Sequence, residues 1–314
     1  MFATTFSQML VILLLALLGW GLRKGKILSD PFLSKLNLLL VLVAQPAMML
    51  TSTQPDAASA SPANFLMAAG ITTAALILMM ALMFLFTHRL PRKVYAVICS
   101  AASLPNFGYM GIPIAQVVLG EESIFFLSAS VIGFNIAQWT MGSLLFGKAQ
   151  DTGHRRNPNI ILPALGLGVL LLVLNIRLPG PLLGALKQLS NLNTPLAMLI
   201  LGARMEHLRI SDFKDPRIWL VSFAKLIAFP LALLAVLRPL PLSPLLVNTL
   251  VLGFAMPCAA NVQIQTELKQ GDTLLAARCI TVTMLLSLLT IPLIMWIAGW
   301  PPRSPIRRRA SAAS

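Results

Sequence analysis

Charged residues are scarce in this chain of 314 residues, at 11% of the total against 57% hydrophobic residues. A soluble domain carries about 25% charged residues, so this chain lacks the polar side chains needed to cover a water-facing surface. Apolar runs of about 18 to 24 residues recur along the chain, and a helix of that length crosses a ~30 Å hydrocarbon core. No stretch between these runs is long enough for a separate soluble domain. The composition therefore predicts an all-α polytopic membrane protein with short loops.

Acidic residues are particularly few, ten in all, and each lies in a loop or near the end of an apolar run. A cation site or a proton relay in a membrane protein usually contains a carboxylate inside a span. The absence of a carboxylate inside a predicted span favours an anionic or neutral substrate and does not identify a coupling ion.

Cysteine and histidine number three each. Cys99, Cys258 and Cys279 fall in or at the ends of apolar runs without close spacing, which argues against a disulfide framework and a zinc site and predicts buried free thiols. The histidines lie in separate loops. The sequence contains no G-x-x-x-x-G-K-[ST] phosphate loop, no nucleophile elbow and no pair of intramembrane carboxylates. We therefore expect no catalytic residue, no metal site and no cofactor.

Basic residues, in contrast, give the chain a net charge of +14. They lie in loops, where they meet lipid head groups, so membrane lipid and not nucleic acid is the expected partner. Sixteen of the 24 fall on one side of the predicted spans, which places that side in the cytoplasm and both termini outside. The ten predicted spans are 4–22, 33–52, 64–87, 94–118, 123–146, 158–176, 186–204, 217–237, 244–268 and 274–299.

The two halves contain similar landmarks at nearly the same offset along the chain. Pro46-Ala47-Met48 resembles Pro195-Leu196-Ala197-Met198, and Pro105 corresponds to Pro257. Because each half has five predicted spans, such a repeat must be inverted in the membrane, as in many secondary transporters. The predicted organisation is a first five-helix repeat (1–147), a short cytoplasmic linker (148–157), a second inverted repeat (158–299) and a basic disordered tail (300–314).

The fourth and ninth predicted spans are interrupted. The fourth contains Pro105 and Pro113 with two glycines, and the ninth contains Pro257 in Met256–Asn261. Proline removes a backbone donor and breaks a helix, and bare peptide groups at membrane depth must be covered by protein or face a wet cavity. Paired broken helices in two halves indicate a binding site near the membrane midplane, although either break alone could be a packing kink.

The predicted substrate-binding residues lie at these breaks and beside the matched prolines. A broken helix exposes the N-terminus of its second half, which attracts a carboxylate. Lys225 lies inside the eighth span; we expect it to extend to the cytoplasmic edge, with attraction of an anion as the alternative. The substrate-binding set is Pro105, Asn106, Pro257, Asn261, Gln45 and Thr194.

Two motifs carry a family resemblance. Leu104-Pro105-Asn106 followed by Met110-Gly111-Ile112-Pro113 is similar to the fourth-helix motif of the auxin efflux carrier family, which includes plant PIN-type carriers and bacterial malonate and malate carriers. Asn193-Thr194-Pro195-Leu196-Ala197-Met198 with Leu201-Gly202 resembles its seventh-helix motif. The residues that follow Pro257 do not match the family pattern.

The resemblance implies five-plus-five inverted repeats with crossing broken helices 4 and 9, a homodimer, elevator-like movement and carboxylate recognition at Asn106. The sequence and the resemblance together predict a bacterial inner-membrane carrier for a small organic anion, for example a dicarboxylate such as malonate. An anion channel and an intramembrane enzyme remain the alternatives.

Overall fold

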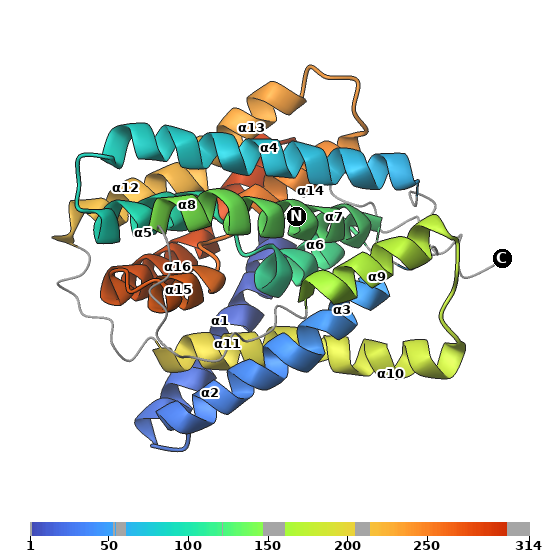
Figure 1. Cartoon of the computed structure of the whole chain (residues 1–314), viewed down its shortest axis with the longest axis horizontal. Helices are drawn as coiled ribbons and strands as arrows, with labels where there is room; N and C mark the ends of the chain where they lie inside the picture. The colour runs from blue at the N-terminus through green and yellow to red at the C-terminus, as the bar shows by residue number, and fades with distance from the viewer. Residues whose placement is uncertain are drawn as a thin grey trace.

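The computed structural model describes residues 2–52, 54, 61–120, 122–146, 161–204 and 214–299. These ranges are helical and contain no β-strand; the one isolated bridge in them pairs Pro105 with Cys258. The helices form one bundle, in which α4 lies across one side and the α2–α3 and α10–α11 segments lie on the other (Figure 1). The predicted linker 148–157 and tail 300–314 lie outside the described residues.

The first half of the bundle contains eight α-helices and three π-helical turns. Short turns or direct continuations join several of them into longer rods. In chain order they are α1 (Phe2–Lys24), α2 (Asp30–Leu39), η1 (Leu40–Ala44), α3 (Gln45–Ser52), α4 (Pro62–Thr87), α5 (Arg92–Ser103), η2 (Phe107–Gly111), α6 (Ile112–Val118), α7 (Glu122–Ala137), η3 (Gln138–Gly142) and α8 (Ser143–Phe146).

The second half follows a similar order of rods. Within the described residues, helix covers most of each predicted range. The fourth and ninth ranges are interrupted as expected, and the seventh is also divided, between α10 and α11. The elements are α9 (Ile161–Val173), α10 (Gly180–Asn191), α11 (Asn193–Arg204), α12 (Pro216–Phe223), η6 (Ala224–Ala228), α13 (Phe229–Leu237), α14 (Pro244–Phe254), α15 (Asn261–Leu268) and α16 (Thr273–Ile297).

Several helices begin at a polar residue that caps the first turn. The Ser243 hydroxyl accepts from the Leu246 amide at 3.2 Å before α14, and the Asp272 carboxylate accepts from the Leu275 amide at 3.0 Å before α16. Asp215 does the same for α12. Such side chains satisfy donors that the helix itself leaves unpaired, so the starts of these spans are fixed by local chemistry.

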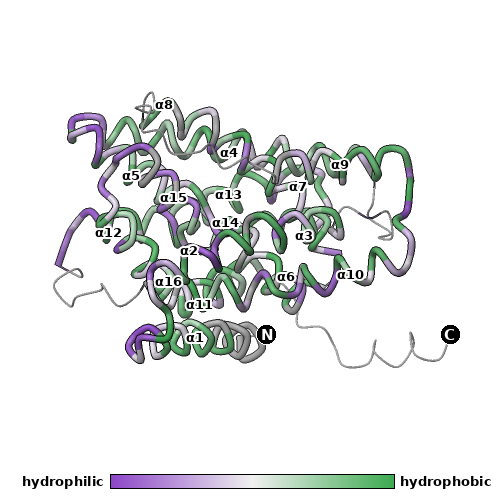
Figure 2. Tube along the Cα trace, turned by 60° about the horizontal axis from the view of Figure 1, so that its bottom comes forward, coloured by the Kyte–Doolittle hydropathy of each residue, from purple (hydrophilic) through white to green (hydrophobic). Residues whose placement is uncertain are grey.

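Five helical stretches within the described ranges are long and apolar enough to cross a membrane. Their ends and the loops between helices are hydrophilic, whereas their bodies are hydrophobic (Figure 2). Phe86 in α4 and Trp296 in α16 leave 80% and 73% of their surface exposed, as expected for side chains that face lipid. The ten-span count and the inverted repeat stay predictions. The five stretches are Asp30–Thr51, Pro62–Thr87, Glu122–Phe146, Pro216–Leu237 and Thr273–Ile297.

Two glycine residues allow helices α1 and α11 to pack closely against each other. Helix α1 packs against α11 where Gly19 faces the backbone of Leu199 and Gly202 faces the backbone of Ala16. A Cβ atom at either glycine would collide with the facing carbonyl oxygen. Glycine therefore lets the two backbones touch, which is a common way of joining helices inside a membrane.

Candidate functional site

The two interrupted spans meet each other in the middle of the bundle. One interruption lies between α5 and η2, and the other between α14 and α15. The Asn106 amide donates to the Pro257 carbonyl oxygen at 2.9 Å, and the Ala259 amide donates to the Leu104 carbonyl oxygen at 3.0 Å. These reciprocal bonds form the antiparallel bridge and join the two halves of the chain at their breaks.

Proline chemistry explains the conformation at the first break. Leu104 precedes Pro105 and is extended, with φ −84° and ψ 107°, because the proline ring disfavours the helical region for the residue before it. Across the bridge, the Cys258 amide donates to the Thr283 hydroxyl of α16 at 3.2 Å. The peptide groups that the breaks remove from the helices are thus partly satisfied by each other and by α16.

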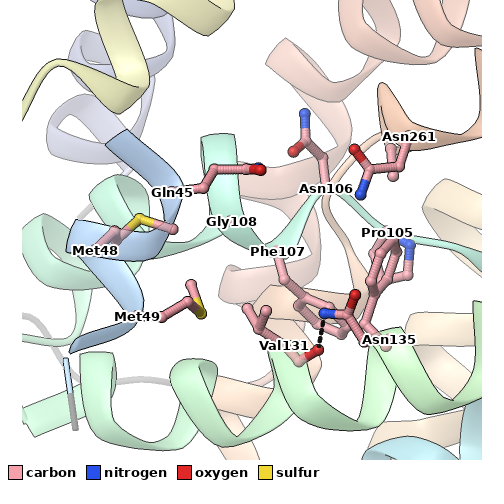
Figure 3. A pocket seen from close by; sticks show the side chains of 12 residues that line it. Gln45, Met48, Met49, Pro105, Asn106, Phe107, Gly108, Val131, Asn135 and Asn261 are labelled. Atoms are coloured by element: carbon pink, nitrogen blue, oxygen red, sulfur yellow. Dashed lines mark hydrogen bonds between the residues drawn. The ribbon is translucent and has the colours of Figure 1, made fainter. Parts of the chain in front are cut away.

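A pocket opens beside this crossing. It has an empty volume of ≈420 Å³, open solvent included, and none of its lining residues carries a charged side chain. Amide side chains and apolar side chains share the lining (Figure 3). The lining residues are Gln45, Met48, Met49, Pro105, Asn106, Phe107, Gly108, Val131, Phe134, Asn135, Ala259 and Asn261.

The polar groups of the pocket come from four different helical segments. The Gln45 side chain extends from α3 toward the side where the Asn106 and Asn261 side chains lie near each other (Figure 3). Gln45 is 7% exposed, and its Oε1 atom has no hydrogen-bond partner among the described residues. Asn135 in α7 donates from Nδ2 to the Val131 carbonyl oxygen at 2.8 Å. An amide offers both donors and an acceptor, so the pocket can pair with either kind of ligand atom.

The structure brings four of the six predicted site residues to this pocket: Gln45, Pro105, Asn106 and Asn261. Pro257 is buried behind the lining, where its carbonyl oxygen accepts the Asn106 bond. The side chain of Thr194 lies outside the described residues. A role of these residues in binding stays a prediction.

Asn135 is the polar lining residue that sequence reasoning missed. It lies in the otherwise apolar α7 sequence ESIFFLSASVIGFNIA and is 5% exposed. A lone amide inside an apolar span is a signal of a polar interior, because burying an amide without a partner is costly. That signal was present in the sequence, but the face of the helix on which Asn135 lies could not be read from it.

Lys225 does not extend to the cytoplasmic edge, so that expectation is wrong. It lies in η6 and is fully buried, and its Nζ atom donates to the Phe254 carbonyl oxygen at 3.0 Å. Phe254 is the last residue of α14, and the carbonyls at a helix C-terminus lack intrahelical partners and carry partial negative charge. The partial negative charge at the C-terminus of α14 lies close to Lys225 and attracts its side chain, whereas the cytoplasmic edge of the membrane is distant.

Metal-binding and redox features are not prominent in the described ranges. They contain no group of three or more His, Cys, Asp or Glu residues placed to hold a metal ion. Cys99, Cys258 and Cys279 are buried free thiols, as predicted.

Comparisons with known proteins identify the family of this chain. A family model described as membrane transport protein matches residues 4–159 and 151–295. The chain is 24% identical to an uncharacterized transporter of Methanocaldococcus jannaschii over 301 residues, which cover 92% of this chain and 97% of the relative. It is 26% identical to an uncharacterized transporter of Methanothermobacter thermautotrophicus over 300 residues, 93% of this chain and 98% of the relative. The chain therefore belongs to the membrane transport protein family, the family of the auxin efflux carriers.

Proposed function

We propose that this chain is a secondary carrier for a small organic anion and that the pocket at the crossing is its binding site. The observation that carries the proposal is the convergence of Gln45, Asn106, Asn135 and Asn261 on a pocket at two paired helix breaks. Paired breaks in the two halves are where secondary transporters bind their substrates. A dicarboxylate such as malonate is the substrate class that we favour.

Anion recognition here would depend on amides and helix ends. Amide NH₂ groups donate to carboxylate oxygens, and hydrogen bonds to a charged group are stronger than those to a neutral one. η2 begins directly after Asn106 and α15 begins at Asn261, so positive helix ends lie beside the same amides. Because no arginine or lysine lines the pocket, we expect modest affinity and easy release, which suits a carrier.

Movement of the crossing as one body is part of the same proposal. The two backbone hydrogen bonds and the Cys258–Thr283 bond tie both breaks and α16 together. A unit joined in this way can shift against the rest of the bundle in an elevator-like step without exposing bare peptide groups to lipid. We further propose that the carrier works as a homodimer in a bacterial inner membrane, with its basic loops in the cytoplasm.

A ligand screen on the purified protein tests the proposal. Small mono- and dicarboxylates, their uncharged amides and small amines are added to the protein in nanodiscs, and the thermal unfolding midpoint is recorded. A ligand that binds the folded state raises the midpoint in proportion to the logarithm of its concentration over its Kd. We expect a rise with carboxylates and a much smaller one with the matched amides.

Stabilisation by amines with no response to any carboxylate would contradict the anion proposal and leave the transporter family untouched. Flux measurements in proteoliposomes distinguish the carrier from its alternatives. Saturable counterflow is expected of a carrier, whereas a conductance beyond carrier rates would indicate a channel. Chemical conversion of the ligand by purified protein would indicate an enzyme.

A further inference from the structure

Lys225 is a fully buried ammonium near the middle of the stretch Pro216–Leu237, which is apolar enough to cross a membrane. Burying a charge at that depth is expensive and such residues usually serve a function. Within the described residues no carboxylate forms an ion pair with Lys225. Its partners are the Phe254 carbonyl oxygen, 3.0 Å from Nζ, and the face of the Phe254 ring, whose centroid lies 5.9 Å from Nζ.

These partners compensate the charge only in part. The C-terminal end of α14 supplies a fraction of a negative charge, and the ring supplies a quadrupole and no net charge. In its protonated form, Lys225 therefore keeps a net positive charge beside the break in the ninth span. The position of Lys225 in η6 holds it there, because η6 packs against α12, α13, α5 and α16.

Two buried rings connect this charge to the pocket. The Phe254 ring contacts the Phe107 ring edge to face, with 5.4 Å between their centroids, and Phe107 lines the pocket. The distance from Lys225 Nζ to the Phe107 centroid therefore cannot exceed the 5.9 Å from Nζ to the Phe254 centroid and the 5.4 Å between the two centroids taken together. Phe254 and Phe107 are 0% and 2% exposed, and buried apolar rings screen a nearby charge poorly.

We propose that protonated Lys225 strengthens the preference of the pocket for anions, acting through Phe254 and Phe107 without touching the ligand. The inference rests on the proposed carrier function and deepens it, because the lining offers only amides and the partial charges of helix ends, and no charged side chain, to distinguish a carboxylate from an amide. Lys225 is in this sense a positioning and selectivity residue, placed behind the aromatic pair. The amides and helix ends of the lining would favour the charged ligand modestly, and the buried ammonium would add to that preference.

Three substitutions separate charge from packing. Lys225→Arg keeps the positive charge, Lys225→Gln keeps a hydrogen-bond donor for the Phe254 carbonyl without the charge, and Lys225→Met keeps only the length. For each variant and the wild type, the affinities for a short dicarboxylate and for its uncharged diamide are measured in nanodiscs by calorimetry. The quantity of interest is the ratio of the two affinities, which a general loss of structure would not change selectively.

We expect the wild type and Lys225→Arg to prefer the dicarboxylate and both neutral variants to lose most of that preference. Two unit charges about 10 Å apart at an effective dielectric of ~20 attract each other enough for roughly a tenfold effect per carboxylate. The diamide affinity should stay within about twofold in all variants.

The contrary outcomes are distinct. A wild type without any preference for the dicarboxylate would overturn the proposed anion carrier itself. A wild-type preference that Lys225→Gln and Lys225→Met both retain would overturn only the role of Lys225. An equal fall in both affinities would assign Lys225 a structural role and also overturn the inference. If Lys225→Met does not fold, Lys225→Gln decides, because it can still satisfy the Phe254 carbonyl.

Discussion

The backbone amide of Asn106 donates a 2.9 Å hydrogen bond to the carbonyl oxygen of Pro257, so each broken helix supplies what the other lacks. Pro257 cannot donate, and its carbonyl lies where α14 has already ended. The reciprocal bond from Ala259 to the Leu104 carbonyl oxygen completes the pair. The site at the crossing is consequently built from both halves of the chain, and neither half could form it alone.

Replacing Gln45 with leucine should separate stability from binding. The Oε1 atom of Gln45 is buried without a partner, which costs about 1–3 kcal/mol for such a group. We expect Gln45→Leu to unfold at the same temperature as the wild type or a higher one, and to bind carboxylates more weakly. Thermal unfolding and ligand titration in nanodiscs measure the two effects.

Gln188→Leu on α10 is the matched control, because Gln188 is exposed and far in sequence from the crossing. It should change neither quantity. A lower unfolding temperature for Gln45→Leu would show that the Gln45 side chain stabilises the fold, and unchanged affinity would show that it does not contact the ligand.

Asp215 should make the start of α12 sensitive to acid. Its carboxylate accepts hydrogen bonds from the Arg217 side chain and amide, and the side-chain bond above all lowers the pKa of Asp215 below its ordinary value of 3.8. Stability from this contact is complete at pH values above that ordinary value and is lost as the pH falls through the lowered pKa of the folded protein.

Asp215→Ala should accordingly cost about 0.5–2 kcal/mol near neutral pH, the usual range for a helix cap, and less at low pH. The difference in unfolding midpoint between variant and wild type, followed from about pH 7 to about pH 3 in detergent, measures it. Asp30→Ala removes an ion pair whose carboxylate is 81% exposed and should have little effect at any pH. A constant difference for Asp215→Ala across the range would contradict the assignment.

The contact between α1 and α11 should not tolerate even one added methyl group. A Cβ at position 202 would collide with the backbone of Ala16, whereas a Cβ at Gly184 meets no atom within 4 Å. We expect Gly202→Ala to destabilise the protein by about 1–3 kcal/mol through overpacking. Gly184→Ala on α10 should be neutral or slightly stabilising, since alanine favours helix. Equal unfolding midpoints for the two variants would mean that α1 and α11 do not pack as described.

The helix breaks could be predicted from the sequence because proline acts locally. Pro105 and Pro257 interrupt their spans wherever the rest of the chain goes. Gln45 and Asn106 follow from their places beside prolines, and Asn261 follows from its place at the second break. The side of the helix on which the Asn135 and Lys225 side chains lie could not be predicted in this way. Lys225 lies inside the π-helical turn η6, which rotates its residues relative to an ideal helix. The side of α7 on which Asn135 lies depends on packing and not on spacing alone.

The depth of Lys225 in its span illustrates the same limit. The position of Lys225 in the sequence gives its distance from the cytoplasmic edge of the membrane, so we first expected its side chain to extend toward that edge. The deciding factor is the end of α14, which lies next to η6 only after folding. A partner that comes from 29 residues farther along the chain leaves no mark on the local pattern around Lys225.

Counterflow by the Asn106→Ala variant tests most directly whether the pocket at the crossing holds the substrate. The protein is reconstituted in proteoliposomes, and the half-saturation constant for a labelled dicarboxylate is measured for the wild type, Asn106→Ala and the exposed control Asn191→Ala. Losing one hydrogen bond to a charged group costs about 1.5–3 kcal/mol, so the constant for Asn106→Ala should rise roughly ten- to hundredfold while its unfolding midpoint stays near that of the wild type. Wild-type counterflow with an unchanged half-saturation constant in folded Asn106→Ala protein would contradict the account.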